Sequence, residues 1–315
     1  MAQMWKPQRV AVVGAGALGS LLGGLLGEGG LDVTLIDVWK EHIEKIKANK
    51  GLRITGHGGD RTVKVSATTR PEEAGKMDVV IIQTKMRHMT DGAQQALPLL
   101  TERSVVVSFS NGLGKEEILT SVIGGGRVLG GTTAQGAGVV EPGVIRNAGD
   151  LPSTIGELDG TMSDRVRAIA ETFTKAGLKT TASDNVRLAI WKKLMANVGI
   201  NPMSALCNFR VGELFDVPEV KAVILKALEE GEKVANAEGL PLRAQETVEV
   251  LLQITGKGGT GSNRSGMLVD VMAKRKTEID FINGAIVRLG KKHGIPTPVN
   301  ETLVAAVKGL ERDFN

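Results

Sequence analysis

Three glycines near the start of the chain restrict its fold more than any other feature. Gly14, Gly16 and Gly19 follow a β-branched run and precede an apolar segment with helical character. At such a junction the first glycine permits a tight turn, the second lets backbone N–H groups approach a phosphate, and the third packs the helix against the sheet. The spacing therefore predicts a pyrophosphate-binding turn formed by Gly14, Gly16, Ala17, Leu18 and Gly19.

An acidic residue follows this turn at the distance expected for a ribose-binding carboxylate. Asp37 ends a predicted strand and lies 23 residues after Gly14, close to the spacing of about 20 that is typical of dinucleotide-binding folds. A carboxylate there accepts hydrogen bonds from the ribose 2′-OH and repels a 2′-phosphate. Asp37 therefore favours NAD(H) over NADP(H), although Lys40, three residues further on, can reduce the repulsion.

The pattern of the remaining segments predicts two domains. In residues 1–183, strand-like runs alternate with helical ones, which is typical of a doubly wound parallel α/β sheet of the Rossmann type with helices on both faces. In residues 184–315 the long segments all have helical periodicity, so a second, all-helical domain is expected there. The expected strands are Arg9–Val13, Val33–Asp37, Leu52–Thr55, Val63–Ala67, Val79–Gln83, Val105–Phe109, Val128–Thr132, Gly143–Asn147, Ser153–Gly156 and Lys179–Ala182. The expected helices of the second domain are Val186–Val198, Val217–Glu238, Ala244–Thr255, Met267–Lys274, Glu278–His293 and Asn300–Arg312, with a loop at Gly256–Gly261.

Composition excludes several other classes of protein. Aromatic residues make up only 3% of the 315 residues and Tyr is absent, which argues against single-stranded nucleic-acid binding by base stacking. The apolar run at residues 10–27 contains too many glycines for a signal peptide or a membrane span. A single cysteine, Cys207, indicates a reducing compartment, and the four histidines lack metal-ligand spacing. The sequence thus predicts a cytoplasmic protein with a small-molecule substrate and without metal, membrane or nucleic-acid partners.

A polar stripe marks the first helix of the second domain. Lys193, Asn197 and Asn201 recur at intervals of four and therefore share one helix face, just before Pro202. Asn is a poor helix former, so two of them on an otherwise apolar helix indicate a polar cleft, although a solvent-facing stripe is the alternative. The segment at Glu278 borders an apolar face and is uninformative by itself.

Several short motifs, taken together, resemble the ketopantoate reductase (2-dehydropantoate 2-reductase) family almost from end to end. They are Gly14–Gly19, Lys85 after a strand, Ser110-Asn111-Gly112, Lys193-Leu194 with Asn197 and Ile200-Asn201-Pro202, Thr277–Asp280 with Asn283-Gly284, and Gly294–Pro298. The resemblance implies NAD(P)H-dependent reduction of 2-dehydropantoate to pantoate on the route to pantothenate and coenzyme A. It also implies an active site in the cleft between a Rossmann domain and a helical domain.

The resemblance assigns roles to individual residues. Lys193 matches the catalytic lysine, which as a general acid would protonate the developing alkoxide, and Glu278 matches the active-site glutamate, which we expect to orient groups. Lys85 and Asn111 match residues beside the cofactor, with Asn111 also near the substrate. The remaining matches are substrate-binding positions, namely Asn197, Asn201 and Asn263, and Ser265 is a further candidate.

Two departures from the family pattern leave alternatives open. Gly266 stands where many members have serine. A serine hydroxyl that would contact the substrate is therefore missing, and Ser265 would replace it only in part. Val38 stands where members have the arginine that favours NADP(H), so the family's usual NADP(H) and the NAD(H) indicated by Asp37 both remain candidates. The alternatives are a reductase of another small 2-keto acid and a dinucleotide-sensing protein without turnover. The long C-terminal helices are candidates for a homodimer interface.

Overall fold

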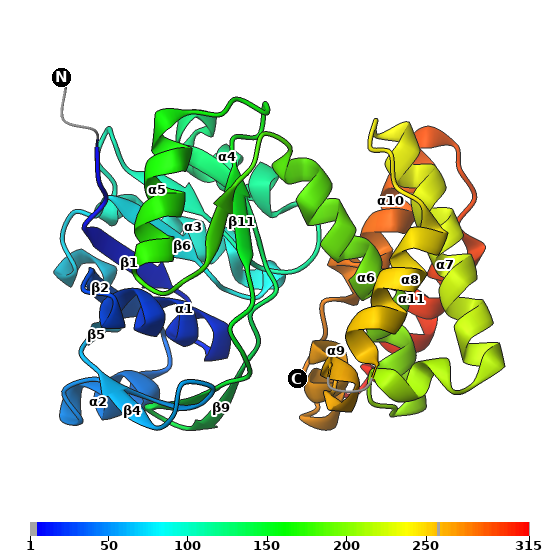
Figure 1. Cartoon of the computed structure of the whole chain (residues 1–315), viewed down its shortest axis with the longest axis horizontal. Coiled ribbons are helices and arrows are strands. Elements are labelled where there is room, and N and C mark those ends of the chain that lie inside the picture. The colour runs from blue at the N-terminus through cyan, green and yellow to red at the C-terminus, as the bar shows by residue number, and fades with distance from the viewer. Residues whose placement is uncertain (1–4, 257–258, 315) are drawn as a thin grey trace. The chain divides into compact units, whose positions relative to one another are not determined.

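The computed structural model describes residues 5–256 and 259–314, and it divides the chain into two compact units (Figure 1). The N-terminal unit contains the residues up to Ser110 together with Lys115–Ala189. The C-terminal unit contains Asn111–Gly114 and the residues from Ile190 onward. The short loop at residues 111–114 thus groups with the helical part of the chain although it interrupts the α/β part.

An eight-stranded sheet forms the centre of the N-terminal unit. The order of its strands is β12-β11-β8-β7-β6-β1-β2-β5. The first six strands of this sheet in chain order are parallel to one another, namely β1, β2, β5, β6, β7 and β8. They stand in the 3-2-1-4-5-6 order of dinucleotide-binding folds. The Rossmann-type prediction is therefore confirmed. The strands are β1 (Arg9–Val13), β2 (Asp32–Ile36), β5 (Ser66–Thr68), β6 (Val79–Ile82), β7 (Val105–Val107), β8 (Val128–Thr133), β11 (Ser153–Gly156) and β12 (Thr180–Ala182).

Helices cover both faces of this sheet (Figure 1). Helices α1 (Ala17–Glu28) and α5 (Asp164–Lys175) pack on one face, and α3 (Met89–Ala96) and α4 (Lys115–Ile123) pack against each other and on the opposite face. Helix α2 (Lys40–Ala48) packs beside β5. The central strands β1 and β6 are almost wholly buried and rich in valine and isoleucine, as expected for parallel strands that are covered on both sides.

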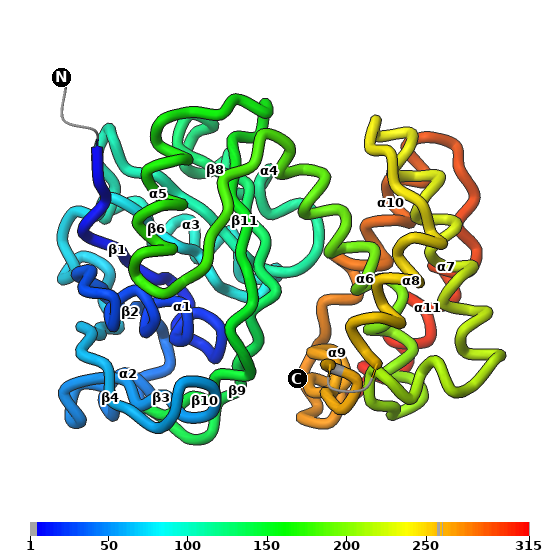
Figure 2. The backbone as a smooth tube through the Cα atoms, in the orientation of Figure 1, coloured from blue at the N-terminus to red at the C-terminus, as the bar shows by residue number. Residues whose placement is uncertain are grey.

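A second, four-stranded sheet was not anticipated from the sequence. It has the order β4-β3-β10-β9 and joins β3 (Leu52–Gly56) and β4 (Arg61–Val63) to β9 (Ala137–Glu141) and β10 (Val144–Asn147), which lie together in Figure 2. The single strand predicted at Val63–Ala67 is wrong, because β4 ends at Val63 in this sheet and β5 begins at Ser66 in the main one. The main sheet departs from the parallel arrangement at one strand, since β11 runs antiparallel to β8.

The C-terminal unit is helical in the described residues, and α7 packs against α8, α10 and α11. The helices are α6 (Val186–Cys207, whose first four residues group with the N-terminal unit), α7 (Pro218–Ala237), α8 (Ala244–Thr255), α9 (Gly266–Met272), α10 (Asn283–His293) and α11 (Pro298–Leu310). No helix among residues 5–256 and 259–314 is long and apolar enough to cross a membrane.

Two helices differ from their predicted bounds for identifiable reasons. The helix predicted to end at Val198 continues through Pro202 to Cys207. Pro202 lacks the N–H that would bond the Val198 carbonyl, and the side chain of Asn283 donates to that carbonyl instead, at 3.1 Å. The helix predicted over Glu278–His293 is split at Ile282, whose φ of −104° and ψ of −93° are not helical.

Candidate functional site

The turn after β1 has the geometry that its glycines predict. Gly14 has a φ of +95°, and a Cβ there would lie 2.7 Å from the Gln83 carbonyl carbon. At Gly19 a Cβ would lie 2.0 Å from the Gly14 carbonyl oxygen, so both positions require glycine. At Gly16, in contrast, a Cβ would meet no atom within 4 Å. Gly16 therefore leaves open space above the turn, which is where a ligand phosphate would approach the backbone.

The start of helix α1 is free of acidic side chains and side-chain caps. Gly16 is the N-cap residue and provides no side-chain hydrogen bond, and the first turn, which contains Ala17 and Leu18, holds no acidic residue. The N–H groups of a first helical turn have no intrahelical partners and carry partial positive charge. The turn is thus suited to bind an anionic pyrophosphate group, and the residues present fit a dinucleotide.

Asp37 lies directly after β2 with its carboxylate held in place. The backbone N–H of Trp39 donates to Asp37 Oδ1 at 2.9 Å, and the N–H of Asp37 donates to the Thr68 carbonyl at 3.3 Å. The side chain is half-buried, whereas the next residue, Val38, is 73% exposed. A carboxylate fixed at the carboxyl end of the second strand stands at the position of the ribose-binding acid.

Lys85 follows β6, the strand next to β1 in the sheet. The Gln83 N–H donates to the Val13 carbonyl at 2.7 Å, which joins the end of β6 to the end of β1. Ser110 Oγ donates to the Thr84 carbonyl at 2.8 Å and so fixes the residue before Lys85. Strand order reverses between β1 and β6, and ligands of such folds bind outside the carboxyl ends of the strands at this point. The half-buried Lys85 therefore lies at the expected cofactor edge.

The buried histidine His42 supports the phosphate-binding turn. The sequence patterns did not identify this residue. The Gly143 N–H donates to His42 Nδ1 at 3.0 Å, so this nitrogen is the acceptor and Nε2 carries the proton. Nε2 lies 3.0 Å from Ser20 Oγ, which donates to the Ala15 carbonyl at 2.8 Å. Burial lowers the pKa of His42, and the nearby Asp37 charge opposes this effect. The neutral ring thus connects the turn to the second sheet.

The sequence pattern that could have identified His42 lies in helix α2. His42 precedes Ile43 on the buried side of that helix and is fully buried itself. The Trp39 ring stacks on the imidazole with a centroid separation of 4.8 Å. A histidine on an apolar helix face, shortly after Asp37, was the available clue.

The C-terminal unit brings the polar stripe of α6 together with Asn111. Asn197 Nδ2 donates to Asn111 Oδ1 at 3.5 Å. Lys193 and Asn197 are half-buried, and Asn201 is only 8% exposed. The stripe is therefore not a fully solvated face. It combines one lysine with two asparagines, whose neutral amides can both donate and accept hydrogen bonds.

The segment that carries Glu278 joins the same group of residues. The loop of residues 111–114 packs on Phe281, because the Leu113 N–H donates to the Phe281 carbonyl at 3.0 Å and a Cβ at Gly112 would lie 2.6 Å from that oxygen. The half-buried Glu278 precedes the 3₁₀ turn Ile279–Phe281. Asn111, the α6 stripe and the Glu278 segment are thus linked by hydrogen bonds within one unit.

Asn263 and Ser265 belong to the segment that leads into α9. The Asn263 carbonyl accepts from the Val211 N–H at 3.0 Å, shortly after α6 ends, and its side chain is exposed. Ser265 is the N-cap of α9, and its Oγ accepts from the Leu268 N–H at 3.1 Å. Gly266 begins that helix, and a Cβ there would meet no atom within 4 Å. The hydroxyl of Ser265 thus already serves the helix end.

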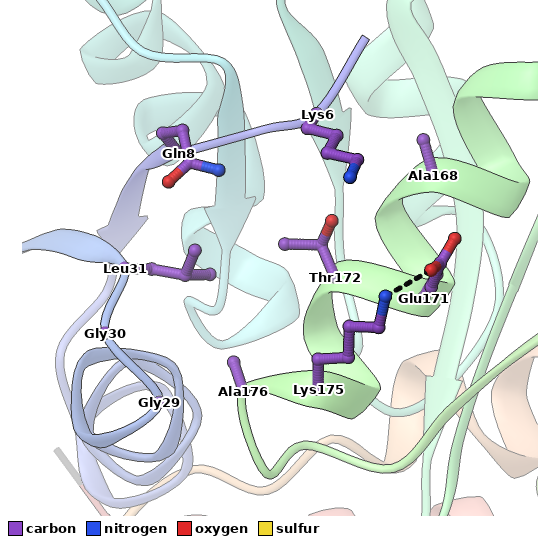
Figure 3. A pocket seen from close by; sticks show the side chains of 10 residues that line it. All are labelled: Lys6, Gln8, Gly29, Gly30, Leu31, Ala168, Glu171, Thr172, Lys175 and Ala176. Atoms are coloured by element: carbon purple, nitrogen blue, oxygen red, sulfur yellow. Dashed lines mark hydrogen bonds and ion pairs between the residues drawn. The ribbon is translucent and has the colours of Figure 1, made fainter. Parts of the chain in front are cut away.

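A surface pocket in the N-terminal unit lies away from the turn Gly14–Gly19, Asp37 and Lys85, which follow the carboxyl ends of their strands. Figure 3 shows Lys6, Gln8 and Leu31 on one side and Lys175, paired with Glu171, on the other. Gln8 and Leu31 precede β1 and β2, so the pocket belongs to the amino ends of the strands, opposite the edge where ligands of this fold bind. Among the residues that the structure describes, no cluster of three His, Cys, Asp or Glu side chains suits a metal ion.

Burial raises the pKa of the Cys207 thiol.

The sheet order and the phosphate-binding turn together define a Rossmann-type dinucleotide-binding protein with a helical second unit. Two family models match the chain, "Ketopantoate reductase PanE/ApbA" over residues 10–160 and "Ketopantoate reductase PanE/ApbA C terminal" over residues 185–311. The 2-dehydropantoate 2-reductase of Halobacterium salinarum is 36% identical over 306 residues, covering 97% of this chain and 99% of the relative. The chain therefore belongs to the ketopantoate reductase family.

Solved structures show the same similarity. A ternary complex of D-mandelate dehydrogenase with NADH and anilino(oxo)acetate matches with a TM-score of 0.91 at 28% identity, covering 96% of this chain and 98% of that one. A ketopantoate reductase of the PanE/ApbA family from Ralstonia eutropha matches with a TM-score of 0.87 at 31% identity, again covering 96% and 98%. Both neighbours are similar to this chain over nearly its whole length.

Proposed function

We propose that this protein is an NAD(P)H-dependent 2-dehydropantoate 2-reductase, which reduces ketopantoate to pantoate for pantothenate and coenzyme A biosynthesis. The observation that carries the proposal is the contact between Asn111 and the α6 stripe, which includes Lys193. Curated reductases from Halobacterium salinarum and Archaeoglobus fulgidus, each 36% identical over nearly the full length, support the same substrate. Residues 1–183 would bind the cofactor, and residues 184–315 the substrate.

The cofactor would be held by the turn Gly14–Gly19, by Asp37 and by Lys85. When bound, the reduced nicotinamide supplies the hydride for the reaction. The fixed carboxylate of Asp37 and the neutral, exposed Val38 after it favour an unphosphorylated ribose, so we propose NAD(H) as the preferred form. The solved neighbour D-mandelate dehydrogenase contains NADH, which supports a nicotinamide dinucleotide as the cofactor.

The residues of the C-terminal unit would carry out the proton chemistry. As the ketone carbon is reduced, negative charge develops on its oxygen, and the Lys193 ammonium would donate a hydrogen bond and then a proton to it. Amide N–H groups for the substrate carboxylate would come from Asn197, Asn201 and Asn111. The anion would thus be bound by uncharged hydrogen-bond donors. Glu278 would orient the substrate hydroxyl rather than accept the transferred proton. Asn263 and Ser265 would contribute to the outer part of the substrate site.

A second candidate is the reduction of a different 2-keto acid. The neighbour with the TM-score of 0.91 is a D-mandelate dehydrogenase bound to anilino(oxo)acetate, an aryl-substituted 2-oxo acid. Gly266 offers space and no hydroxyl at a position where serine is common in the family. The space at Gly266 would leave room for a larger substituent on the 2-keto acid, such as an aryl group.

Absorbance of reduced nicotinamide tests the proposal directly. The protein would be mixed with NADH or NADPH and with either ketopantoate or benzoylformate, the 2-keto acid that is reduced to mandelate. Faster oxidation with ketopantoate, lost in Lys193→Ala, is the expected result. Faster oxidation with benzoylformate would establish the second candidate. Cofactor binding without turnover of any 2-keto acid would contradict both and indicate a dinucleotide sensor.

A further inference from the structure

Helix α6 contains a proline in its interior at the turn that carries two candidate substrate ligands. In a helix each N–H bonds the carbonyl four residues earlier, so Pro202, which has no N–H, cannot bond the Val198 carbonyl. Asn197 precedes Val198 and Asn201 precedes Pro202, so the missing bond lies within their turn. Val198 and Pro202 are both buried, and a buried carbonyl without a partner is costly.

Asn283 supplies the missing donor from another helix. Its Nδ2 donates to the Val198 carbonyl at 3.1 Å and to Asn300 Oδ1 at 2.9 Å. The Asn283 side chain is fully buried and lies one residue after the break at Ile282. This amide therefore connects α6 to the segment that begins with Glu278.

Asn283 also donates to a buried network that joins α7 to α11. Asn300 Nδ2 donates to the Ala227 carbonyl at 3.0 Å and to Glu230 Oε2 at 2.7 Å. The Glu230 carboxylate also accepts from the backbone N–H groups of Val299 and Asn300, at 2.8 and 2.9 Å, in the first turn of α11. Asn300 is fully buried and Glu230 is 7% exposed. Asn300 and Glu230 thus join α11 to α7, whereas the bond to α6 comes from Asn283 alone among these residues.

We propose that Asn283 is a positioning residue, which sets the lysine–asparagine stripe of α6 against the Glu278 segment by replacing the hydrogen bond that Pro202 removes. It touches neither substrate nor cofactor in this proposal, and acts through the Val198 carbonyl. The proposal rests on the function given above, because the stripe is taken to bind the 2-keto acid. A displacement of about 1 Å in such a site can reduce the rate by a factor of about 100.

The double variant Asn283→Ala with Pro202→Ala separates this role from general support of the core. Alanine at 202 restores a backbone N–H for the Val198 carbonyl, which makes the Asn283 donor unnecessary. Four variants would be compared with the wild type: Asn283→Ala, Pro202→Ala, the double variant and Asn300→Ala. Asn300→Ala is the matched control, because it removes a fully buried amide of the same network and leaves the bond to α6 in place.

The expected results differ between the variants. Asn283→Ala lowers kcat/KM for the 2-keto acid by about tenfold or more, since a buried carbonyl loses its partner. Its Kd for NADH, measured by fluorescence, stays close to that of the wild type, because the phosphate-binding turn belongs to the N-terminal unit. The double variant regains most of the kcat/KM of Pro202→Ala. Asn300→Ala lowers the Tm by roughly 3–10 °C with a much smaller change in kcat/KM than Asn283→Ala.

Several outcomes would overturn the proposal. They are a double variant as slow as Asn283→Ala, a folded Asn283→Ala with wild-type kcat/KM, and an Asn300→Ala as impaired in turnover as Asn283→Ala. If Asn283→Ala fails to fold, recovery of folding and turnover in the double variant supports the role, and failure of the double variant contradicts it.

The Tm values keep this test distinct from that of the proposed function. If the wild type reduces no 2-keto acid, the proposed function is wrong. The role of the Asn283–Val198 hydrogen bond is then tested by Tm alone. Asn283→Ala should lower the Tm much less in the Pro202→Ala background than in the wild type. An unchanged Tm loss in the double variant would show that Asn283 does not act through the Val198 carbonyl.

Discussion

The phosphate-binding turn of the N-terminal unit and the polar stripe of α6 reach their geometry by different means. The turn is shaped by the backbone, because Gly14 and Gly19 occupy positions where any Cβ would collide with backbone atoms. The stripe is shaped by side chains, since α6 continues past Pro202 and Asn283 donates a hydrogen bond to the Val198 carbonyl there. The glycines of the turn lie close together in the sequence and are restricted by backbone atoms, whereas the other site needs side chains from four helices.

This difference predicts how each site responds to mutation. A backbone-built turn tolerates almost no change at its glycines, yet its supports can be altered with moderate effect. A side-chain site separates more easily into parts, because the residues that touch the ligand differ from those that position them. Substitutions in the two units should therefore affect different measurements, and the following experiments compare them.

Substitution of Gly19 should have the largest effect. Gly19→Ala places a methyl group 2.0 Å from the Gly14 carbonyl oxygen, so we expect a fall in Tm of more than about 10 °C or failure to fold. Gly16→Ala meets no protein atom and should keep the wild-type Tm, but it should weaken NADH binding by about tenfold or more, because the methyl group fills the space for the phosphate. Thermal melts and NADH titrations measure both.

Gly309→Ala is a control for the glycine series. Gly309 is exposed in α11, and a Cβ there would meet no atom within 4 Å, so alanine should leave NADH affinity unchanged and raise stability slightly. Equal NADH affinity in Gly16→Ala and the wild type would contradict the assignment of the turn.

Replacement of the stripe lysine should reduce turnover without reducing stability. Lys193→Ala removes the proposed proton donor, and kcat should fall by about 10²–10⁴-fold while Kd for NADH stays the same. Lys192→Ala is the matched control, since Lys192 is the adjacent residue and is exposed, and it should stay within about twofold of the wild type. A loss of similar size in both variants would show that Lys193 has no special role.

A smaller effect is expected at the ribose-binding position. Asp37→Asn removes the charge and retains an oxygen that can accept from the Trp39 N–H. KM for NADH should rise by about tenfold, because a hydrogen bond to a charged group is lost, and KM for NADPH should fall. Steady-state kinetics with both cofactors measure the change. A wild type that prefers NADPH, with Asp37→Asn unaltered, would remove Asp37 from cofactor selection.

The smallest effect is expected at His42 and appears in the pH dependence of stability. Its pKa is lowered from the ordinary value of 6.5 in the folded protein, so the unfolded chain binds more protons as pH falls through this region. The free energy of unfolding should therefore decrease below about pH 6.5. Urea denaturation at several pH values would show this slope in the wild type and less of it in His42→Asn, which cannot titrate there. Equal slopes would contradict the role of a neutral His42.

The sequence was sufficient for the parts of the molecule that local rules determine. Gly14, Gly16 and Gly19 predicted the turn, and periodicity predicted most strands and helices to within a few residues. The second sheet was beyond such rules, because β3 pairs in parallel with β10, about 90 residues later. The continuation of α6 was also beyond them, since the donor for Val198 comes from residue 283.

The site residues divide in the same way. Lys193 and Asn197 were recognisable as a stripe from their spacing alone, whereas the meeting of Asn197 with Asn111 depends on the tertiary fold. Their roles in binding and proton transfer remain predictions. Asn283 was visible only as part of a motif, and nothing in its neighbours indicated that its amide bonds another helix.

The proline in α6 also determines the order in which its surroundings can change during evolution. A carbonyl oxygen can accept two hydrogen bonds, so exchanging Pro202 for a residue with an N–H adds a donor to Val198 and leaves that of Asn283 in place. Exchanging Asn283 first leaves the carbonyl without a donor. Lineages that lose the asparagine should therefore have lost the proline earlier, and chains that retain the proline should retain the asparagine as well.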